Sequence, residues 1–421
     1  MSLSGLRAAE SDADLLDAAG RAFEGDAPKL LGVAVSGGSD SMAALHLMVQ
    51  AAQHAGWEVH AVTVDHGLRP EARDEAAHVG RICAGLGVAH DVLVWEHGAI
   101  SGNLMDQARR ARYRLMADWA RARGIGHVVL GHTADDQAET FLMGLAREAG
   151  LEGLSGMRAA WREGGVVFGR PFLAIPREDL RGYLRRRGVT WLDDPTNADA
   201  HYTRVKARRV LAALTPLGIT VRHLSRVVDN LNFAQSALVQ ATVTAASQVA
   251  IEAAGGLVFD RAGFQALPFE VQRRLLIAGL RWVSAAAYAP RAAALGRVQG
   301  AILSGADTTL WGCRIRVGAA GICITREPRA VAGVVCDLDQ MWDGRWRLMG
   351  PKAAGLTVRA LGAVGLRQCK NWRECGVSRD ALLVSPAIWR DDTLVAAPVA
   401  GVNNGFSAKI DAGFNSFIVS H

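Results

Sequence analysis

A glycine turn between an apolar run and a helical pattern is the feature that most constrains the fold of this chain. Residues 30–35 are largely apolar and predict a buried strand, and apolar residues recur with helical spacing at Met42, Leu45, Leu47 and Met48. Between them stands Ser36-Gly37-Gly38-Ser39-Asp40-Ser41. A strand, a glycine turn and a helix N-terminus bring backbone N–H groups to one point. The pattern therefore predicts an anion site.

The residue types in this turn suit a phosphate group. Glycine lets the backbone approach a ligand without a Cβ clash, and three serine hydroxyls add donors. The carboxylate of Asp40 fits such a loop if Mg²⁺ lies between it and the phosphates. The chain has no G-x-x-x-x-G-K-[ST] pattern, so the Walker-type loop is excluded. At this point a turn that is merely rich in small residues remains the alternative.

Composition narrows the class of protein. Half of the 421 residues are hydrophobic and 21% are charged, which predicts a globular chain of two or three domains. The net charge of +6 permits a nucleic-acid partner. Six scattered cysteines without a C-x-x-C pair favour neither a zinc ribbon nor a disulfide framework. Since a signal-peptide pattern and an uncharged membrane span are also missing from the sequence, we expect a cytoplasmic protein.

Strand-like and helical patterns alternate in the first half of the chain. Strands are expected at 30–35, 57–64, 90–94 and 127–130, with helices to about 54, from Pro70, over 104–123 and from about 135. Nearly all-apolar strands separated by helices predict an α/β fold with a doubly wound, Rossmann-like parallel sheet. Asp65, His66 and His132 follow strands, as the Ser36–Ser41 turn does. We expect all of them in one crevice beyond the carboxyl ends of the strands.

The alternation stops after Pro195, and the second half reads differently. Residues 202–214 form a basic helical pattern, 220–251 a long helix, and 268–283 a further helix. Residues 309–325 alternate like a hairpin, and 328–333 read as a linker before several short strand-like runs. We therefore predict three domains: 1–218 with the glycine turn, a mainly helical domain at 219–328, and a small β-rich domain at 329–421.

A second candidate site is the stretch from Gly131 to Thr140. On a helix, Asp135 and Asp136 lie four and three residues before Glu139, so the three carboxylates can share one rim. Acidic residues in a first helical turn are also ordinary partners of the helix dipole. The preceding His132 and the strand-end position favour a functional cluster.

These motifs together resemble a known family. The S-G-G-x-D-S turn is similar to the loop of the N-type ATP pyrophosphatases of the PP-loop superfamily, which cleave ATP to AMP and pyrophosphate. Within that group the chain resembles the tRNA(Ile)-lysidine synthetases. The further motifs that carry the resemblance are Asp65–Arg69, Ala108–Tyr113, Gly131–Thr140, Gly153–Met157, Arg170–Leu173 with Arg177, Leu180 and Tyr183, Asp193–Asn197, and segments at 370–377 and 385–401.

The resemblance implies a reaction and its reactants. The wobble cytidine of tRNA(Ile) with a CAU anticodon would be adenylylated by ATP, with Mg²⁺ as cofactor, and the amine of L-lysine would then replace AMP to give lysidine. No membrane partner is expected, and the oligomeric state stays open, with a homodimer as one candidate. Because the lysine amine has a reference pKa near 10.4, it needs a carboxylate to hold it and to accept its proton.

The implied roles divide among four groups of residues. The ATP-binding residues would be Ser36, Gly37, Gly38, Ser39, Asp40, Ser41, Asp65 and His66, with Asp40 also the metal ligand. The catalytic residues would be Asp40, His132 and Asp136; for His132, an ordinary strand-end histidine is the alternative. The lysine site would use Asp136, Glu139 and Arg112, although Arg112 has a tRNA phosphate or plain solvent as open alternatives. The tRNA-binding residues would be Arg204, Lys206 and Arg208.

One departure and three rival functions accompany this interpretation. The family's R-N-x-x-R pattern is here Arg204-Val205-Lys206-Ala207-Arg208, so Val205 replaces an asparagine.

A tRNA 2-thiolation enzyme would need reactive cysteines, and Cys83 is the only one in the first domain. An amidotransferase-type synthetase would need a glutaminase module, for which the chain has no nucleophile motif. A non-catalytic nucleotide- or tRNA-binding protein would not need carboxylates beside ATP.

Overall fold

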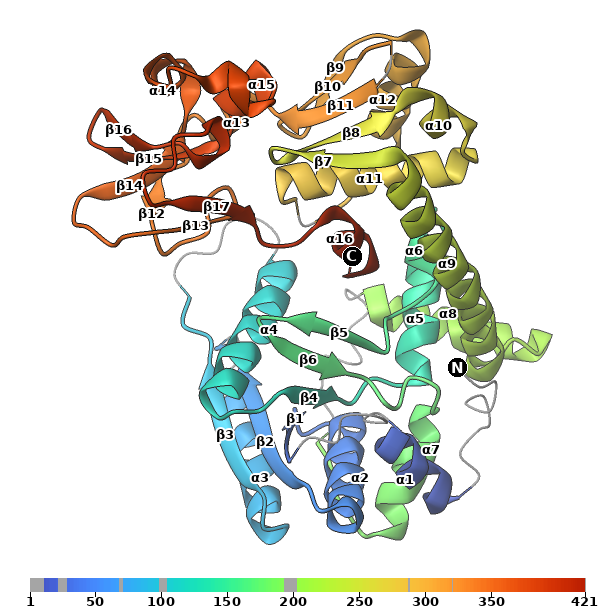
Figure 1. Cartoon of the computed structure of the whole chain (residues 1–421). Coiled ribbons are helices and arrows are strands. Elements are labelled where there is room, and N and C mark those ends of the chain that lie inside the picture. Colours follow the sequence, from blue (N-terminus) through green and yellow to red (C-terminus); the bar gives the residue numbers. More distant parts are fainter. Residues whose placement is uncertain are drawn as a thin grey trace. The chain divides into compact units, whose positions relative to one another are not determined.

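The computed structural model describes residues 11–21, 29–67, 71–97, 104–192, 203–286, 288–319 and 321–420. It contains two compact units, Met1–Gln235 and Ser236–His421 (Figure 1). The long helix α9 (Val221–Val249) begins in the first unit and ends in the second. The three-domain division at 218 and 328 stays a prediction.

The first unit is built on a six-stranded sheet of order β3-β2-β1-β4-β6-β5. Its strands are β1 (Leu30–Ala34), β2 (Glu58–Asp65), β3 (Ala89–Val94), β4 (His127–Leu130), β5 (Ala160–Glu163) and β6 (Val166–Gly169). All neighbours pair parallel except β5, which runs antiparallel to β6 at the edge. The α/β class with a parallel sheet is confirmed. The β5–β6 hairpin was not among the predicted strands.

Alternating side chains of the sheet pack against helices on both of its faces. Leu31 and Val33 of β1 and Val129 of β4 join a core with α1, α2, α3 and α7, whereas Val128 and Leu130 join a second core with α4. Both faces are therefore covered, which is why these strands are nearly all apolar. The helices are α1 (Asp12–Arg21), α2 (Ser39–Ala55), α3 (Ala72–Gly85), α4 (Leu104–Ala122), α5 (Ala134–Leu145), α6 (Leu151–Leu154), α7 (Arg177–Arg186) and α8 (Thr203–Leu214).

The predicted helices of this unit agree with the structure to within a few residues. The expected start of a helix at Pro70 lies outside the described residues, and α3 is described from Ala72. The motif residues Leu68, Arg69 and Asp193–Asn197 also lie outside them. The basic segment forms α8, and its Val205 and Ala207 are buried.

The second unit combines helices with antiparallel sheets (Figure 1). The predicted hairpin at 309–325 belongs to a five-stranded sheet. The expected linker at 328–333 begins instead with a short helix, and Pro328 occupies the first turn of this helix, a position that suits proline. No helix in the described parts of the chain has the length and hydropathy needed to cross a bilayer. The elements of this unit are β7 (Ala250–Ala253), β8 (Gly256–Asp260), α10 (Arg261–Ala266), α11 (Phe269–Ser284), α12 (Ala292–Ser304), β9 (Thr308–Leu310), β10 (Cys313–Val317), β11 (Gly321–Arg326), α13 (Pro328–Val331), β12 (Cys336–Asp337), β13 (Trp346–Met349), β14 (Leu356–Ala360), α14 (Gly362–Gln368), α15 (Arg379–Leu383), β15 (Pro386–Arg390), β16 (Thr393–Ala396), β17 (Ser407–Ile410) and α16 (Phe414–Ser420).

The strand order brings the predicted site segments together. β1 lies between β2 and β4, so the ends of these three strands are adjacent at the point where the strand order reverses. Gly131 follows β4 and passes very close to the first turn of α2. A Cβ atom at this position would lie 2.7 Å from the carbonyl oxygen of Asp40 and 2.9 Å from Cα of Ser41. Only glycine fits between these two backbone segments.

This close approach predicts the effect of a single methyl group. Gly131→Ala should lower the free energy of unfolding by about 2–3 kcal/mol, because rigid backbone atoms must move apart to admit the Cβ. Gly126→Ala is the matched control, since a Cβ there meets nothing within 4 Å, and it should change stability by less than about 0.5 kcal/mol. Urea unfolding of both variants measures the difference. Equal stabilities of Gly131→Ala and Gly126→Ala would show that the end of β4 and the first turn of α2 do not pack tightly at Gly131.

Candidate active site

The turn after β1 has the backbone geometry of an anion-binding loop. Gly37 has a φ of +84°, and Gly38 is the extended N-cap residue of α2. The hydroxyl of Ser41 donates to the carbonyl of Gly38 (3.0 Å) and accepts from the backbone N–H of Ser36 (3.1 Å). The side chain of Ser41 therefore fixes the shape of the loop, while Ser36 is exposed at its tip.

An arginine, Arg177, stands at the centre of the carboxylates that the sequence predicted. Its Nε donates to Oδ2 of Asp40 at 2.7 Å, although the two residues are 137 positions apart. The same guanidinium lies 3.4 Å from Asp136 and 3.5 Å from Glu139. Oδ2 of Asp135 accepts the backbone N–H of Arg177 at 2.7 Å. The predicted shared rim of carboxylates is thus present, and Arg177 occupies it.

Asp136 and Glu139 differ in their surroundings. Oδ2 of Asp136 accepts from the backbone N–H and the hydroxyl of Thr133, which forms a capping box at the start of α5. Arg177 and these hydrogen bonds outweigh burial and lower the pKa of Asp136. Glu139 is only 1% exposed; its Oε1 accepts from Nε of Arg208 at 2.6 Å, and its Oε2 is buried with no hydrogen-bond partner.

His132 is held in its neutral form. Arg170, itself buried, donates from Nε to Nδ1 of His132 at 3.2 Å. Because an arginine can only donate, Nδ1 must be the acceptor and the proton of the neutral ring is on Nε2. Burial, followed by the charge of Arg170, lowers the pKa of His132 to about 3. His132 can therefore offer an N–H donor at neutral pH, but it is a poor proton acceptor.

Arg112 and the end of β2 form the neighbouring part of the site. The charge of Arg112 contributes to lowering the pKa of both His66 and His132, after burial, so its guanidinium faces the same region. It donates to the hydroxyl of Tyr113 at 3.3 Å, and its Nε is buried without a partner. Asp65 is buried and accepts the backbone N–H of Gly67 at 2.8 Å. Arg112 is half-buried, and its assignment to the lysine carboxylate, to a tRNA phosphate or to solvent stays open.

The predicted tRNA-binding residues of α8 separate into two groups. Arg204 is exposed and close enough to His132 to affect its pKa, and Arg208 contacts Glu139. Lys206 is exposed, and no contact places it at the site. Val205 faces inward and is 6% exposed. At the position of the family's asparagine this chain thus places an apolar side chain in the core.

Two residues of the site were not assigned a role from the sequence, namely Arg170 and Arg177. Both lie in quoted motifs, but their partners come from distant segments. One sequence signal existed for Arg177. It is the first residue of α7, where a positive charge is unfavourable beside the helix dipole, so an arginine there indicates an acidic partner. Nothing comparable marks Arg170, whose guanidinium lies 4.0 Å from the centre of the Trp161 ring.

The site suits a Mg²⁺ ion that is held by one carboxylate, Asp40, together with substrate phosphates. Mg²⁺ is commonly bound through one or two carboxylates together with substrate phosphates. In the parts of the chain that are described, no cluster of three His, Cys, Asp or Glu residues is arranged to hold a metal ion. Asp40 supplies a carboxylate beside the loop, and its Oδ1 and Oδ2 accept from Ser39 and Arg177.

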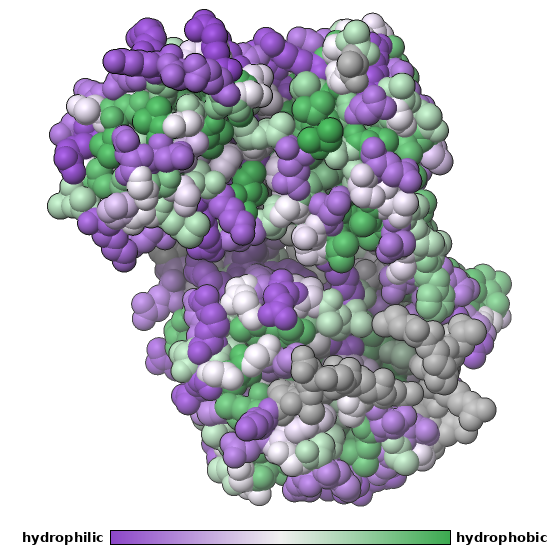
Figure 2. All heavy atoms as spheres, in the orientation of Figure 1, coloured by the Kyte–Doolittle hydropathy of each residue, from purple (hydrophilic) through white to green (hydrophobic). Residues whose placement is uncertain are grey.

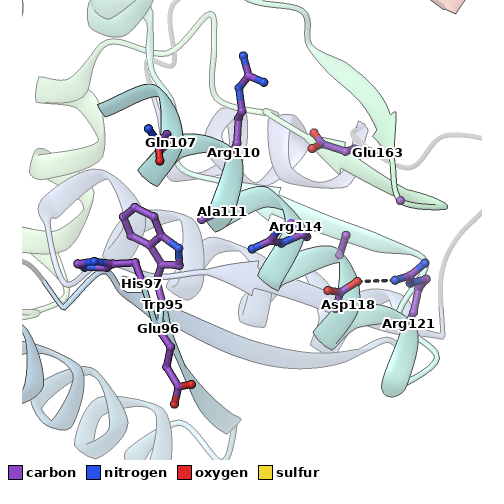
Figure 3. Close-up of a pocket in the computed structure, with 12 residues that line it drawn as sticks. Trp95, Glu96, His97, Gln107, Arg110, Ala111, Arg114, Asp118, Arg121 and Glu163 are labelled. Atoms are coloured by element: carbon purple, nitrogen blue, oxygen red, sulfur yellow. Dashed lines mark hydrogen bonds and ion pairs between the residues drawn. The ribbon is translucent and has the colours of Figure 1, made fainter. Parts of the chain in front are cut away.

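A cavity of about 730 Å³ lies beside the strand ends and not over the glycine loop (Figure 3). Trp95 and His97 line it from the end of β3, and α4 supplies the opposite wall. Its three arginines, Arg110, Arg114 and Arg121, stand against Glu96, Asp118 and Glu163. These formal charges balance, so the cavity has no clear preference for an anion.

The loop, the sheet and the acidic cluster define an ATP-using enzyme of the PP-loop class. A family model described as "PP-loop domain" matches residues 14–214. A tRNA(Ile)-lysidine synthase of Ruegeria pomeroyi is 42% identical over 97% of both chains. Proteins of the same name from Brucella anthropi and Wolbachia pipientis are 35% and 30% identical, over 86% and 92% of this chain and 84% and 93% of theirs. Among solved structures, a U34-tRNA thiolase from Methanococcus maripaludis matches 52% of this chain and 78% of its own, with 14% identity and a TM-score of 0.45.

The chain belongs to the tRNA(Ile)-lysidine synthase family. The resemblance stated from the motifs is thereby confirmed, as is the class of ATP-using ligase.

The neutral state of His132 predicts how two amide variants will differ. His132→Gln keeps an N–H near the Nε2 position, whereas His132→Asn keeps only an acceptor for Arg170. ATP turnover should survive largely in His132→Gln and fall about tenfold or more in His132→Asn, since a buried donor is lost. Between pH 6 and 8, wild type and His132→Gln should show the same pH profile. An inflection in this range that His132→Gln abolishes would indicate a proton-transfer role instead.

Proposed function

We propose that this protein joins L-lysine to carbon 2 of the wobble cytidine of tRNA(Ile) with a CAU anticodon. ATP would adenylylate the cytidine, and lysine would then displace AMP. The observation that carries this proposal is the meeting of the glycine loop and the acidic cluster at Asp40, in a chain of this family. The loop suits the triphosphate, and the cluster suits the cationic side chain of lysine.

The first step needs stabilisation of the negative charge that develops on pyrophosphate. The backbone N–H groups at the start of α2 and the hydroxyls of Ser36 and Ser39 would bind the phosphates. Asp40 would hold Mg²⁺, which supplies charge neutralisation at the phosphate oxygens when bound. Asp65 and His66 would line the nucleotide site from the adjacent strand end. His132, as a neutral donor through Nε2–H, would hydrogen-bond to the nucleotide or the cytidine.

The second step needs an unprotonated lysine amine close to the activated carbon. Asp136 and Glu139 would hold the ammonium group of lysine, with Arg112 assigned either to its carboxylate or to a tRNA phosphate. Because its pKa is lowered, Asp136 is a weak base, so its role would be to orient the amine, and the proton that the ammonium group loses would pass to water. The unpartnered Oε2 of Glu139 is the carboxylate oxygen best able to take a new donor.

The tRNA would bind through phosphate contacts from several basic residues. Arg204 and Arg208 lie at the predicted site, and Lys206 is exposed on the same helix. In the second unit, hydrophilic side chains gather over α14 and α15 (Figure 2), where the exposed basic residues are Arg367, Lys370, Arg373 and Arg379. Trp389 is 3% exposed, so it is a core residue and not a platform for a base.

The state of Cys83 weighs against 2-thiolation as the alternative. It is the only cysteine of the first unit, it is fully buried, and burial raises its pKa to about 11. A thiol with such a pKa is neither a nucleophile nor a sulfur carrier at neutral pH.

A direct test is incubation with labelled lysine, ATP, Mg²⁺ and the isoleucine tRNA. Covalent label should appear in the RNA, and mass spectrometry should show an added lysine and no exchange of oxygen for sulfur. Asp40→Asn should abolish pyrophosphate release and leave tRNA binding nearly unchanged. Asp74→Asn is the control, because Asp74 is an exposed carboxylate on α3. Normal turnover of Asp40→Asn would disprove its proposed role.

The lysine site predicts a selective effect of Glu139→Gln. Loss of the charged partner should raise the KM for lysine about tenfold or more, and the KM for ATP less than about threefold. Glu148→Gln, an exposed position just after α5, should change neither constant. Steady-state kinetics with each substrate varied in turn provides the measurement. Equal effects of Glu139→Gln on both constants would place the amino acid elsewhere.

A further inference from the structure

Arg177 lies at the centre of the carboxylate cluster. It contacts all four acidic side chains: Asp40 at 2.7 Å, Asp136 at 3.4 Å, Glu139 at 3.5 Å and Asp135 at 3.9 Å. Its side chain is 15% exposed. Burial, the first influence on its pKa, is outweighed by Asp40 and Asp136, so the pKa of Arg177 is raised and it stays charged.

The formal charges of the cluster explain the presence of the Arg177 guanidinium. In the described part of the chain, the four carboxylates form ion pairs with two guanidiniums, those of Arg177 and Arg208, so negative charge is in excess among these residues. Within the described part of the chain, Arg177 is the guanidinium in ion-pair distance of Asp40, Asp135 and Asp136, whereas Glu139 also contacts Arg208. Partly buried carboxylates this close together repel strongly. Arg177 thus stabilises the cluster when no external cation is bound.

The backbone of Arg177 is anchored, whereas its side chain is not tied to the backbone of the fold. The backbone N–H donates to Asp135, and the carbonyl of Ile175, two residues earlier, accepts the N–H of Ala134. Among the described residues, the partners of the guanidinium are carboxylates. It can therefore leave Asp40 and keep its contacts with Glu139 or Asp136 without a change in the fold.

We propose that Arg177 is a positioning residue that acts as an internal counter-ion: it holds Asp40 in the ligand-free protein, and Mg²⁺ must displace it from that carboxylate. This inference rests on the proposed function of Asp40 as the metal ligand. The guanidinium of Arg177 and Mg²⁺ would compete for the carboxylate of Asp40. Premature binding of Mg²⁺ without ATP is thereby disfavoured.

Binding of Mg²⁺ to the ATP-free protein tests the competition directly. At pH 8, isothermal titration should show that Arg177→Gln binds Mg²⁺ about tenfold tighter than wild type, because a charged hydrogen bond to Asp40 no longer has to be broken. Arg181→Gln is the matched control. It removes the same charge one turn along α7, where Nε of Arg181 contacts Ser39 at 3.2 Å. It should change the affinity less than about threefold.

Thermal unfolding supplies a second readout that a purely structural arginine would not produce. Arg177→Gln should have a lower Tm than wild type without Mg²⁺, and added Mg²⁺ should raise its Tm more than that of wild type. If Arg177→Gln does not fold, Mg²⁺ must restore its folding, and Arg177→Lys, which retains the charge but loses the fork, must bind Mg²⁺ more tightly than wild type.

Two outcomes would overturn the inference. The first is an Mg²⁺ affinity of Arg177→Gln that is no higher than that of Arg181→Gln. The second is tight binding that persists when Asp40→Asn is added to Arg177→Gln, since the ion would then lie on other carboxylates. Either result leaves the formation of lysidine, which the labelling experiment measures, as a separate question.

Discussion

The contact between the end of β4 and the first turn of α2 is the constraint on which the site depends. Gly131 lies so close to the backbone of Asp40 that no side chain fits between them. The glycine loop comes from one strand and the acidic helix α5 from the next strand in the sheet. Because the two meet without a gap, Asp40 faces the carboxylates of α5. The loop proposed to bind phosphate and the cluster proposed to bind a cation therefore meet at Asp40.

Much of this arrangement could be predicted from local sequence patterns. The Ser36–Ser41 turn, the apolar strands and the acidic first turn of α5 each have a short-range signature, and the parallel sheet places their ends at one edge. The β5–β6 hairpin was missed because both strands are only four residues long: β5 is a mostly exposed edge strand, and the apolar run of β6, of which Val166 and Phe168 are buried, is too short to stand out. The helix at Pro328 was missed because a proline followed by small residues and Gly333 also marks a linker.

The electrostatic partners could not be predicted in this way. Arg177 and Asp40 are 137 residues apart, and Arg170 and His132 are 38 apart. A basic residue in a motif has many acceptable partners, and only the packing of α7 and the turn after β6 against the strand ends selects one. The same packing decides the chemistry of His132. The sequence left open a catalytic or an ordinary strand-end histidine, whereas beside the buried Arg170 its ring is neutral and its free N–H is a donor.

Val205 shows how a family position can change without loss of the arginines beside it. On α8, Arg204 and Arg208 are four residues apart and share a face, whereas Val205 and Ala207 lie on the buried side. An asparagine side chain at this buried position would need hydrogen-bond partners, and valine removes that need. Arg208 remains on Glu139, so the acidic cluster keeps its second guanidinium. Val205 therefore needs no polar partner in the core and leaves the charged residues of the site unchanged.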